Sequence, residues 1–428
     1  MTVNDRQLFE FLDGQAGSRA PDYLDDILTQ TRRTRQRPAW SSIERWLPVD
    51  ISATRAGLAR PVPWRAITAF VVVGILIAAL IAISVASRQR LPAPYGLARN
   101  GQLLVSGDGD IFSVDPATGK RTAVVSGSTF DFGPVFSRDG TKFLFLRGAP
   151  APCGKADCGL ILAIANADGS GVRELTTGLP SLDWADWSPD GSSIAFLTDA
   201  PTGPGHAVEI IRLDGSPTRI IDVGQPVADV SWRPPTGEEL VFRTDWQADT
   251  TAERGVFAVR ADGSGLRRIP TPAISSEGDY RGVSLSPDGQ LLTYQDTGAK
   301  HFRLNIVDLR TGADRLLPQP AGTAQLGAAF SPDGQDVVYL RWATDDQFRI
   351  VVAPVDGSST GIELGPKAPF GDDGPSINNY GWSPDGTAVL ANYDFERVAR
   401  LLPIDGSKPT DLLKGELALA TYQRLALP

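Results

Sequence analysis

After residue 98 the apolar residues fall in short alternating runs, which predict β-strands rather than helices. Many of these runs follow an aromatic or apolar residue and a turn of the form Ser-Pro-Asp-Gly. Six copies, beginning at residues 135, 186, 231, 284, 329 and 381, have the sequences VFSRDGTKFLFLRG, DWSPDGSSIAFLTD, SWRPPTGEELVFRT, SLSPDGQLLTYQD, AFSPDGQDVVYLRW and GWSPDGTAVLANYD. The serine position, which is Arg233 in the third copy, advances by 51, 45, 53, 45 and 52 residues. One structural unit is therefore used repeatedly.

A second turn follows each copy, between two further apolar runs. Its six instances are IANADGSG at 164, IIRLDGSP at 210, AVRADGSG at 258, VDLRTGAD at 307, APVDGSST at 353 and LPIDGSKP at 402. Glycine tolerates the positive φ that tight hairpin turns need, so each unit is predicted to be four short antiparallel strands. Four-stranded units at a period near 50 residues, without helical stretches between them, are typical of β-propeller blades.

The two ends of the repeat region predict how the ring closes. Residues 99–127 provide three strands but lack the strand that precedes the Ser-Pro-Asp-Gly turn. The C-terminal ALATYQRLALP provides that strand, with Tyr422 in the place of Phe330 and Trp382, while Asn100-Gly101 stand where Asp-Gly stand elsewhere. We therefore predict an all-β fold with seven blades over residues 99–428, closed by a C-terminal strand at 419–427. A six-bladed ring with 99–127 packed irregularly is the alternative.

These motifs resemble the repeats of TolB-like β-propellers, over roughly residues 96–428. The resemblance implies the propeller fold and is poor in functional information. TolB-like proteins of the Tol system are soluble and periplasmic, whereas this chain carries an apolar segment and an N-terminal tail. Within that tail, PDYLDDILTQTRRTRQRPAWSSIERWLP at 21–48 resembles the tails of membrane-anchored bacterial propeller proteins that look like anti-sigma factors.

Residues 66–87, AITAFVVVGILIAALIAISVAS, contain no charge. At about 1.5 Å per residue a helix of this segment is ~33 Å long, enough to cross a bilayer. The 65 residues before it are too many for the n-region of a cleaved signal peptide, so we expect one transmembrane helix, followed by a linker at 88–98. The arginines of the tail favour a cytoplasmic N-terminus and an extracytoplasmic propeller, in a bacterial inner (cytoplasmic) membrane.

The tail, residues 1–65, is predicted to be short and partly helical. A helix beginning at Pro21 and ending before Pro38 has acids in its first turns and arginines in its last, which complements the helix dipole. Leu24, Ile27 and Leu28 form a thin apolar stripe, a candidate surface for a cytoplasmic regulator such as a sigma factor. A tail that only enforces topology, and a helix that lies on the lipid surface, remain the alternatives.

Charge and cysteine usage narrow the class of partner. Residues 1–65 carry 10 Arg against 8 acids, and the remainder carries 31 Lys plus Arg against 42 acids, so the net charges of +2 and −11 give −9. The acidic balance argues against nucleic acid, whose phosphates would be repelled. Cys153 and Cys158, in APCGKADCG, are spaced for a disulfide on an oxidising side, with two free thiols as the alternative.

Candidate catalytic chemistry is sparse. The chain has two histidines, His206 and His301, and neither lies near a nucleophile elbow, a second metal ligand at metal spacing or a phosphate-binding loop. We expect no enzyme activity, no cofactor and no metal site, a propeller hydrolase or lyase being the least favoured class.

Blade topology nominates a binding face instead. Both kinds of tight turn fall on one side of the ring, so the longer connections fall on the other, where variable loops commonly bind. Aromatic and acidic residues of these connections are the candidates for binding a protein, peptide or glycan: Trp246, Glu277, Asp279, Tyr280, Trp342, Asp345, Phe370, Asp372 and Asp373. The sequence thus predicts a membrane-anchored binding propeller, either a sensor of the anti-sigma type or an envelope scaffold or Tol-like assembly protein.

Overall fold

The structure is a computed structural model, and it divides into two compact units, Met1–Val85 and Ala86–Pro428. It describes residues 70–75, 91–148, 159–177, 185–199, 206–224, 227–244, 255–271, 284–296, 302–371, 374–375, 377–414 and 419–428. The predicted partner helix with Leu24, Ile27 and Leu28, and the predicted Cys153–Cys158 disulfide, lie outside these residues. In the first unit the description is limited to one helical turn, 70–75, and within the described part of the chain no helix has the length and hydropathy to span a bilayer.

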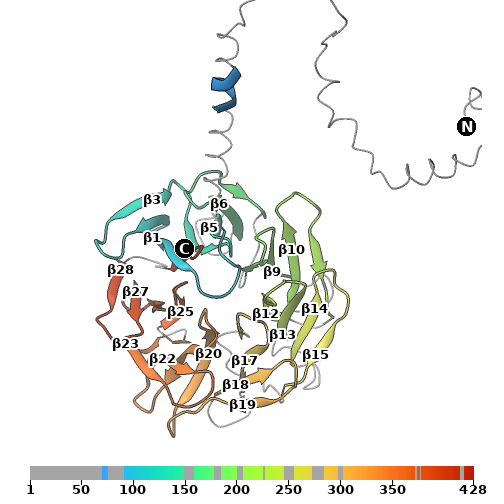
Figure 1. The fold of residues 1–428 in the computed structure, drawn as a ribbon. Helices are drawn as coiled ribbons and strands as arrows, with labels where there is room; N and C mark the ends of the chain where they lie inside the picture. The colour runs from blue at the N-terminus through green and yellow to red at the C-terminus, as the bar shows by residue number, and fades with distance from the viewer. Residues whose placement is uncertain are drawn as a thin grey trace, which may run out of the picture. The chain divides into compact units, whose positions relative to one another are not determined.

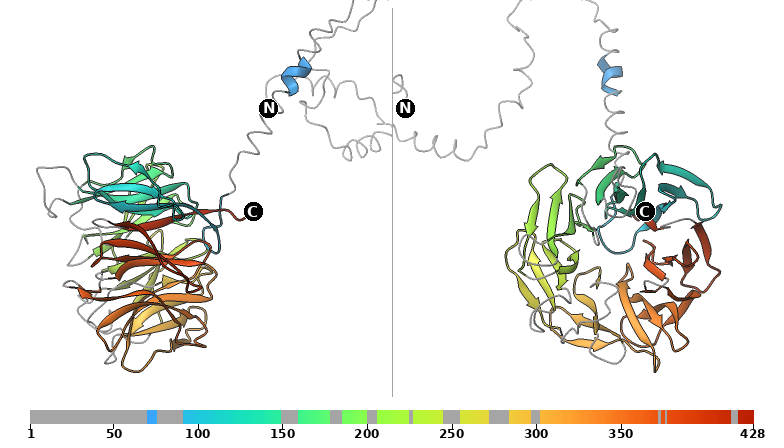
Figure 2. Two further views of the ribbon diagram at one scale, coloured as in Figure 1. Left: turned by 90° about the vertical axis from the view of Figure 1, so that its left-hand side faces the viewer. Right: turned by 180° about the vertical axis from the view of Figure 1, so that it is seen from behind.

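The second unit is a ring of seven antiparallel sheets, one per blade, as Figure 1 shows from the face and Figure 2 from the side and from behind. The strands of blades 1 to 3 are, for blade 1, β4 (Asp131–Phe136), β5 (Lys142–Gly148), β6 (Leu160–Asn166) and β7 (Arg173–Glu174); for blade 2, β8 (Ala185–Trp187), β9 (Ser193–Asp199), β10 (His206–Arg212) and β11 (Arg219–Ile221); and for blade 3, β12 (Val227–Trp232), β13 (Glu239–Thr244), β14 (Val256–Arg260) and β15 (Arg267–Ile269).

The remaining strands are, for blade 4, β16 (Ser284–Leu285), β17 (Leu291–Asp296), β18 (Arg303–Asp308) and β19 (Asp314–Leu316); for blade 5, β20 (Ala324–Phe330), β21 (Asp336–Trp342), β22 (Gln347–Pro354), β23 (Ile362–Gly371) and β24 (Gly374–Pro375); for blade 6, β25 (Ile377–Trp382), β26 (Ala388–Tyr393), β27 (Val398–Pro403) and β28 (Thr410–Lys414); and for blade 7, β29 (Ala420–Leu425), β1 (Arg99–Gly107), β2 (Asp110–Val114) and β3 (Arg121–Val125).

Blade 7 closes the ring by pairing the two ends of this unit. β29 runs antiparallel to β1, with Tyr422 opposite Leu103, as Phe330 lies opposite Val337 in blade 5. The predicted seven-bladed fold is confirmed, and the six-bladed alternative is wrong because residues 99–125 form three regular strands of this blade.

The Ser-Pro-Asp-Gly turn is a small hydrogen-bonded scaffold. In blade 5 the Ser331 hydroxyl donates to Asp333 Oδ1 at 2.6 Å and accepts from the Asp336 amide at 2.9 Å. The same pair of bonds recurs at Ser137, Ser188, Ser286 and Ser383. In the third copy, where arginine replaces serine, Arg233 instead forms an ion pair with Glu239 at 2.8 Å.

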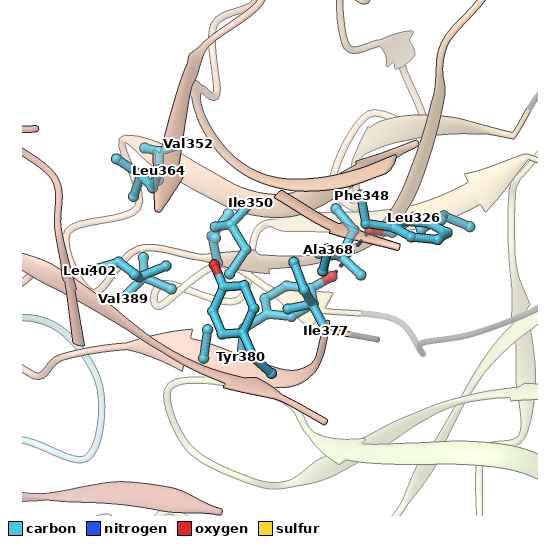
Figure 3. Packing of buried hydrophobic residues seen from close by; sticks show 14 of the residues in the cluster. Leu326, Phe348, Ile350, Val352, Leu364, Ala368, Ile377, Tyr380, Val389 and Leu402 are labelled. Carbon is cyan, nitrogen blue, oxygen red and sulfur yellow. Dashed lines mark hydrogen bonds between the residues drawn. The ribbon is translucent and has the colours of Figure 1, made fainter. Parts of the chain in front are cut away.

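The core consists of hydrophobic clusters between neighbouring blades. The described side chains form seven clusters, and each joins two successive blades of the ring. Figure 3 shows the cluster between blades 5 and 6, in which Phe348 and Ile350 of β22 pack near Ile377 and Tyr380 of β25. Each blade is thus stabilised mainly by burying both of its faces against its neighbours.

An aromatic column at the ends of the innermost strands adds directed bonds between blades. Phe136, Trp187, Trp232 and Phe330 of this column are buried, each at 8% exposure or less. The Trp187 indole donates to the Val135 carbonyl at 3.0 Å, and the Trp382 indole donates to the Ala329 carbonyl at 3.0 Å. Each of these bonds crosses from one blade to the blade before it, so the phrase around each turn is part of the scaffold.

Candidate functional site

Of the nine residues of the predicted binding face, the structure describes Trp342, Asp345 and Phe370, so the face as a whole stays a prediction. Trp246, Glu277, Asp279, Tyr280, Asp372 and Asp373 lie outside the described residues, as does His301. Phe370 belongs to β23, where its backbone pairs with Pro375. Phe370 was expected in one of the longer connections, but β23 continues as a ladder strand to Gly371, and β25 begins at Ile377.

Trp342 packs within blade 5, whereas Asp345 is 44% exposed and ion-paired. The connection that was expected to carry Trp342 and Asp345 is a tight hairpin between β21 and β22, in which the Ala343 amide donates to the Gln347 carbonyl. The Trp342 ring stacks on Phe348 with 5.9 Å between centroids and packs against the cluster between blades 5 and 6. Asp345 forms ion pairs with Arg349 at 2.5 Å and Lys367 at 3.2 Å, and these cations hold the pKa of its carboxyl far below the usual range.

The described residues enclose a cavity at the centre of the ring instead. It has a volume of about 480 Å³ and is lined by the innermost strand of every blade, from β4 round to β29. Residues of the tight turns, including Pro287, Pro332 and Pro384, form its rim. The cavity therefore opens at the face of the ring opposite to the one that the sequence nominated.

The segment just before β1 covers this mouth. We call residues 93–97, Ala93 to Leu97, the strap. Pro94, Tyr95 and Gly96 of the strap line the cavity, and immediately after it the buried Ala98 donates its amide to the Pro384 carbonyl at 2.9 Å. The Tyr95 hydroxyl donates to the Trp232 carbonyl at a long 3.4 Å. Burial raises the pKa of Tyr95 to about 12, with Arg138 opposing and Asp186 adding to the rise.

Two arginines meet beneath the strap. The Arg138 guanidinium lies over the Tyr95 ring, 4.8 Å from its centroid, and forms an ion pair with Asp186 at 3.0 Å. Asp186 also accepts from the Ser231 hydroxyl at 3.0 Å and the Trp232 amide at 3.1 Å, so its carboxylate is fully engaged.

Arg424 has weaker compensation for its charge. It donates to the carbonyls of Ala93 at 3.1 Å and Gly96 at 2.7 Å, both in the strap, and its buried Nε has no hydrogen-bond partner among the described residues. Burial, with a smaller effect of Arg138, lowers the pKa of Arg424 to about 10. Among the residues that the structure describes, no carboxylate pairs with it.

A second, acidic groove lies on the same face of the ring, also bordered by the strap. Its volume is about 880 Å³, and its acidic lining comes from the turns of blades 4 and 5: Asp288, Asp333, Asp336 and Asp356. Burial raises the pKa of Asp336, and the neighbouring Asp333 and Asp356 raise it further. The strap thus lies between a mouth that contains two arginines and a groove that is mainly acidic.

The two arginines have a signal in the sequence, because each stands at a position of the repeat that proline occupies elsewhere. In four of the six copies proline follows the turn serine, but the first copy has Arg138 there. Aligned through Tyr422, Arg424 occupies the same position in blade 7. Blades 7 and 1 are neighbours, so two successive prolines of the rim are replaced by arginine. For Tyr95, which precedes the repeats, no comparable sequence signal exists.

Metal and catalytic groups do not gather in the described part of the chain, where no cluster of three His, Cys, Asp or Glu side chains has metal-binding geometry. His206 is the first residue of β10 and pairs with Asp199 in the ladder of blade 2. This position is away from the innermost strands that line the central cavity.

No protein-family model and no curated protein matches the chain. Similar solved structures include a functionally unknown protein from Desulfotomaculum acetoxidans, 13% identical over 76% of this chain and 100% of that one, with a TM-score of 0.52. The periplasmic gluconolactonase PpgL of Pseudomonas aeruginosa is 18% identical over 76% of this chain and 99% of that one, with a TM-score of 0.50. TolB from Acinetobacter baumannii is 15% identical over 74% of this chain and 81% of that one, with a TM-score of 0.48. At such identities the likeness to the first two structures concerns the propeller fold.

Proposed function

We propose that this chain is a non-enzymatic binding propeller of the cell envelope, and that its protein partner binds at the central mouth on the tight-turn face. The observation that carries the proposal is the cavity of about 480 Å³ to which all seven blades contribute. Cavities of this size, with a mixture of aromatic and convergent polar side chains, are typical of binding sites. A rigid ring built on interblade clusters also suits recognition better than a reaction that needs closure.

The proposal includes the placement of the chain. The uncharged segment at 66–87 supports one membrane span, and the arginines of residues 1–65 support a cytoplasmic tail with the propeller outside the inner membrane. The strap begins six residues after the predicted span, since residues 88–92 separate 87 from 93. A partner at the mouth would therefore bind close to the membrane surface.

Site-specific photo-cross-linking tests where the partner binds. A photoreactive amino acid replaces Leu97, which is 46% exposed at the end of the strap and borders the acidic groove beside the mouth, or Phe395, which is 76% exposed in the β26–β27 connection on the opposite face. The proposal predicts a protein adduct of defined mass from position 97 and none from position 395. An adduct from position 395 alone would place binding on the loop face, and protein adducts at neither position would contradict a binding role.

A role in signalling is the finer part of the proposal, supported by the apolar stripe of Leu24, Ile27 and Leu28. On this account the propeller senses the envelope and the tail acts on a cytoplasmic regulator such as a sigma factor. An envelope scaffold needs its tail only for anchoring. Deleting residues 1–50 separates the two, because a scaffold keeps its function when the shortened chain still inserts, whereas a regulator loses it.

A further inference from the structure

We propose that Arg424 and Arg138 form a carboxylate-binding site at the channel mouth, which the strap now covers and which an acidic peptide segment of a protein partner occupies by displacing the strap. This inference rests on the proposed function and specifies the chemistry of its ligand. It depends on three independent features of the mouth: the placement of the two arginines, the unsatisfied charge of Arg424 and the weak attachment of the strap.

The placement of the arginines is not explained by the turn. Proline is suited to this position of the repeat because its fixed φ favours the turn and no amide donor is needed. The turn of blade 1 forms with Arg138 in place of proline, whereas in blade 7 the strand β29 continues through this position and pairs Arg424 with Asn100 of β1. Both arginines line the cavity. Two cations in one mouth repel each other, and among the described residues only Arg138 has a carboxylate partner, Asp186.

The charge of Arg424 is the second feature. Asp186 compensates Arg138 at 3.0 Å, but Arg424 donates to two strap carbonyls, and its Nε lacks a partner within the described structure. Carbonyl dipoles compensate a buried cation less well than an anion does. A carboxylate that approaches the Nε edge of the guanidinium would form two parallel hydrogen bonds, which are about twice as strong as neutral ones.

The strap is held by few bonds. Tyr95 contributes a hydroxyl bond of 3.4 Å and the contact of its ring with Arg138, and the Arg424 bonds to Ala93 and Gly96 are those that a carboxylate would replace. Leu97 remains 46% exposed. An anion can therefore exchange with the strap at low cost, since the released cation finds a stronger partner.

The neighbouring groove gives the site its direction. Four aspartates, Asp288, Asp333, Asp336 and Asp356, lie on the other side of the strap with a single lining cation, Arg315, so the groove on balance repels a carboxylate. On this face the acidic residue of a peptide therefore binds at the arginines rather than in the groove. The groove favours basic or neutral residues on either side of that acidic residue.

Fluorescence anisotropy with the purified full-length chain tests the proposal. The probe is a labelled peptide, Gly-Ser-Gly-Asp-Asp-Gly-Ser-Gly with both ends blocked, and its control has Asn-Asn in place of Asp-Asp. We expect the wild type to bind the Asp peptide at least about tenfold more tightly than the Asn peptide. Tyr95→Ala, which weakens the attachment of the strap, is expected to increase the affinity for the Asp peptide by about tenfold or more. Arg424→Gln is expected to weaken binding of the Asp peptide by at least about tenfold.

Two further variants guard against effects on folding. Arg424→Lys keeps the positive charge but loses the paired N–H donors of the guanidinium, so it should weaken binding of the Asp peptide less than Arg424→Gln does. Arg310→Gln removes a charge of 75% exposure elsewhere on the ring and should leave binding unchanged. The proposal would be overturned if the Asp and Asn peptides bound equally, or if Arg424→Gln bound the Asp peptide as tightly as the wild type does. It would also be overturned if the chain bound succinate but not the Asp peptide, because the site would then take a small dicarboxylate and not a peptide.

The outcome separates this inference from the proposed function. If position 97 still cross-links to a protein while Arg424→Gln leaves that adduct undiminished, the mouth binds a partner by other chemistry and the inference is wrong. If Arg424→Gln abolishes the adduct together with peptide binding, both stand. If position 97 forms no protein adduct, the proposed function itself fails, whatever the peptides show.

Discussion

Asp131 of blade 1 is a buried carboxylate that forms an ion pair with Arg147. It is 1% exposed and accepts from Arg147 Nε at 2.7 Å and from Arg147 Nη2 at 2.9 Å, across the pair of strands β4 and β5. Asp229 and Arg243 repeat this pair in blade 3 at 3.0 Å. These ion pairs lie at the ends of the strands away from the tight turns, where they fix the inner strand to its neighbour.

Asp131→Ala is expected to lower the free energy of unfolding by about 3 kcal/mol, because it leaves the Arg147 cation largely buried with one partner removed. Glu174→Ala is the matched control. Glu174 bonds the same arginine at 3.1 Å but is 48% exposed, so its loss should cost below about 1 kcal/mol. Urea denaturation of both variants measures the difference, and equal losses would contradict this assignment.

The exposed turn aspartates predict sensitivity to acid. Hydrogen bonds from the hydroxyl and amide of Ser170 lower the pKa of Asp168, and those of Ser264 lower the pKa of Asp262, from the usual 3.8. Because the folded pKa lies below the unfolded one, the stabilisation is present above about pH 4 and is lost as pH falls through the folded pKa. We expect the unfolding temperature of the wild type to fall more steeply below pH 4 than that of Asp262→Asn. If the unfolding temperatures of the wild type and Asp262→Asn fell in parallel below pH 4, this prediction would be contradicted. The same holds for Ser264→Ala, which removes the hydroxyl bond to Asp262, if its unfolding temperature fell in parallel with that of the wild type.

Gly140 lies in the tight turn of blade 1, where this turn packs against β29, the strand that closes the ring. It has φ of 69°, and a Cβ there would overlap the Arg424 carbonyl oxygen in β29. Gln423 of the same strand donates to the Gly140 carbonyl at 2.7 Å. The tight turn of blade 1 therefore packs directly on the strand that closes the ring.

Gly140→Ala should destabilise the chain more than Gly215→Ala, by at least about 1 kcal/mol. Gly215 is also a turn glycine, with φ of 85°, but a Cβ there meets no atom within 4 Å. The backbone strain is thus shared by the two variants, and the crowding is confined to the first. Thermal unfolding of both variants gives the comparison, and similar losses would show that β29 yields to the added methyl group.

The elements also show why the blades could be predicted, whereas two candidates for the binding face, Trp342 and Phe370, belong to strands and not to long loops. Alternating apolar runs and glycine turns are local signals, so the position of Tyr422 in blade 7 followed from its place in the repeat. Phe370 was expected in a connection, yet it lies in β23, toward the outer edge of blade 5, where the missing amide donors of Pro366 and Pro369 are tolerated. Trp342 suggested an exposed aromatic, but a short hairpin places it on Phe348.

At the scale of the whole molecule, the channel mouth depends on contacts between residues hundreds of positions apart. Arg424 reaches the strap carbonyls across more than 300 residues of sequence, and it does so because β29 returns to pair with β1. Neither the repeat nor the charge pattern places Tyr95 at the ring axis. Its position follows from ring closure, which sets the start of β1 beside the central cavity.

If the strap and a ligand exclude each other at this mouth, as we propose, hydrogen exchange of the full-length chain detects the release of the strap. The Ala98 amide, bonded to the Pro384 carbonyl at 2.9 Å, reports whether the segment that carries Tyr95 is docked. With the Asp peptide at saturation we predict that exchange in the segment 91–98 rises by about tenfold or more, while β5 is unchanged. Bound peptide with unchanged exchange in 91–98 would contradict the account.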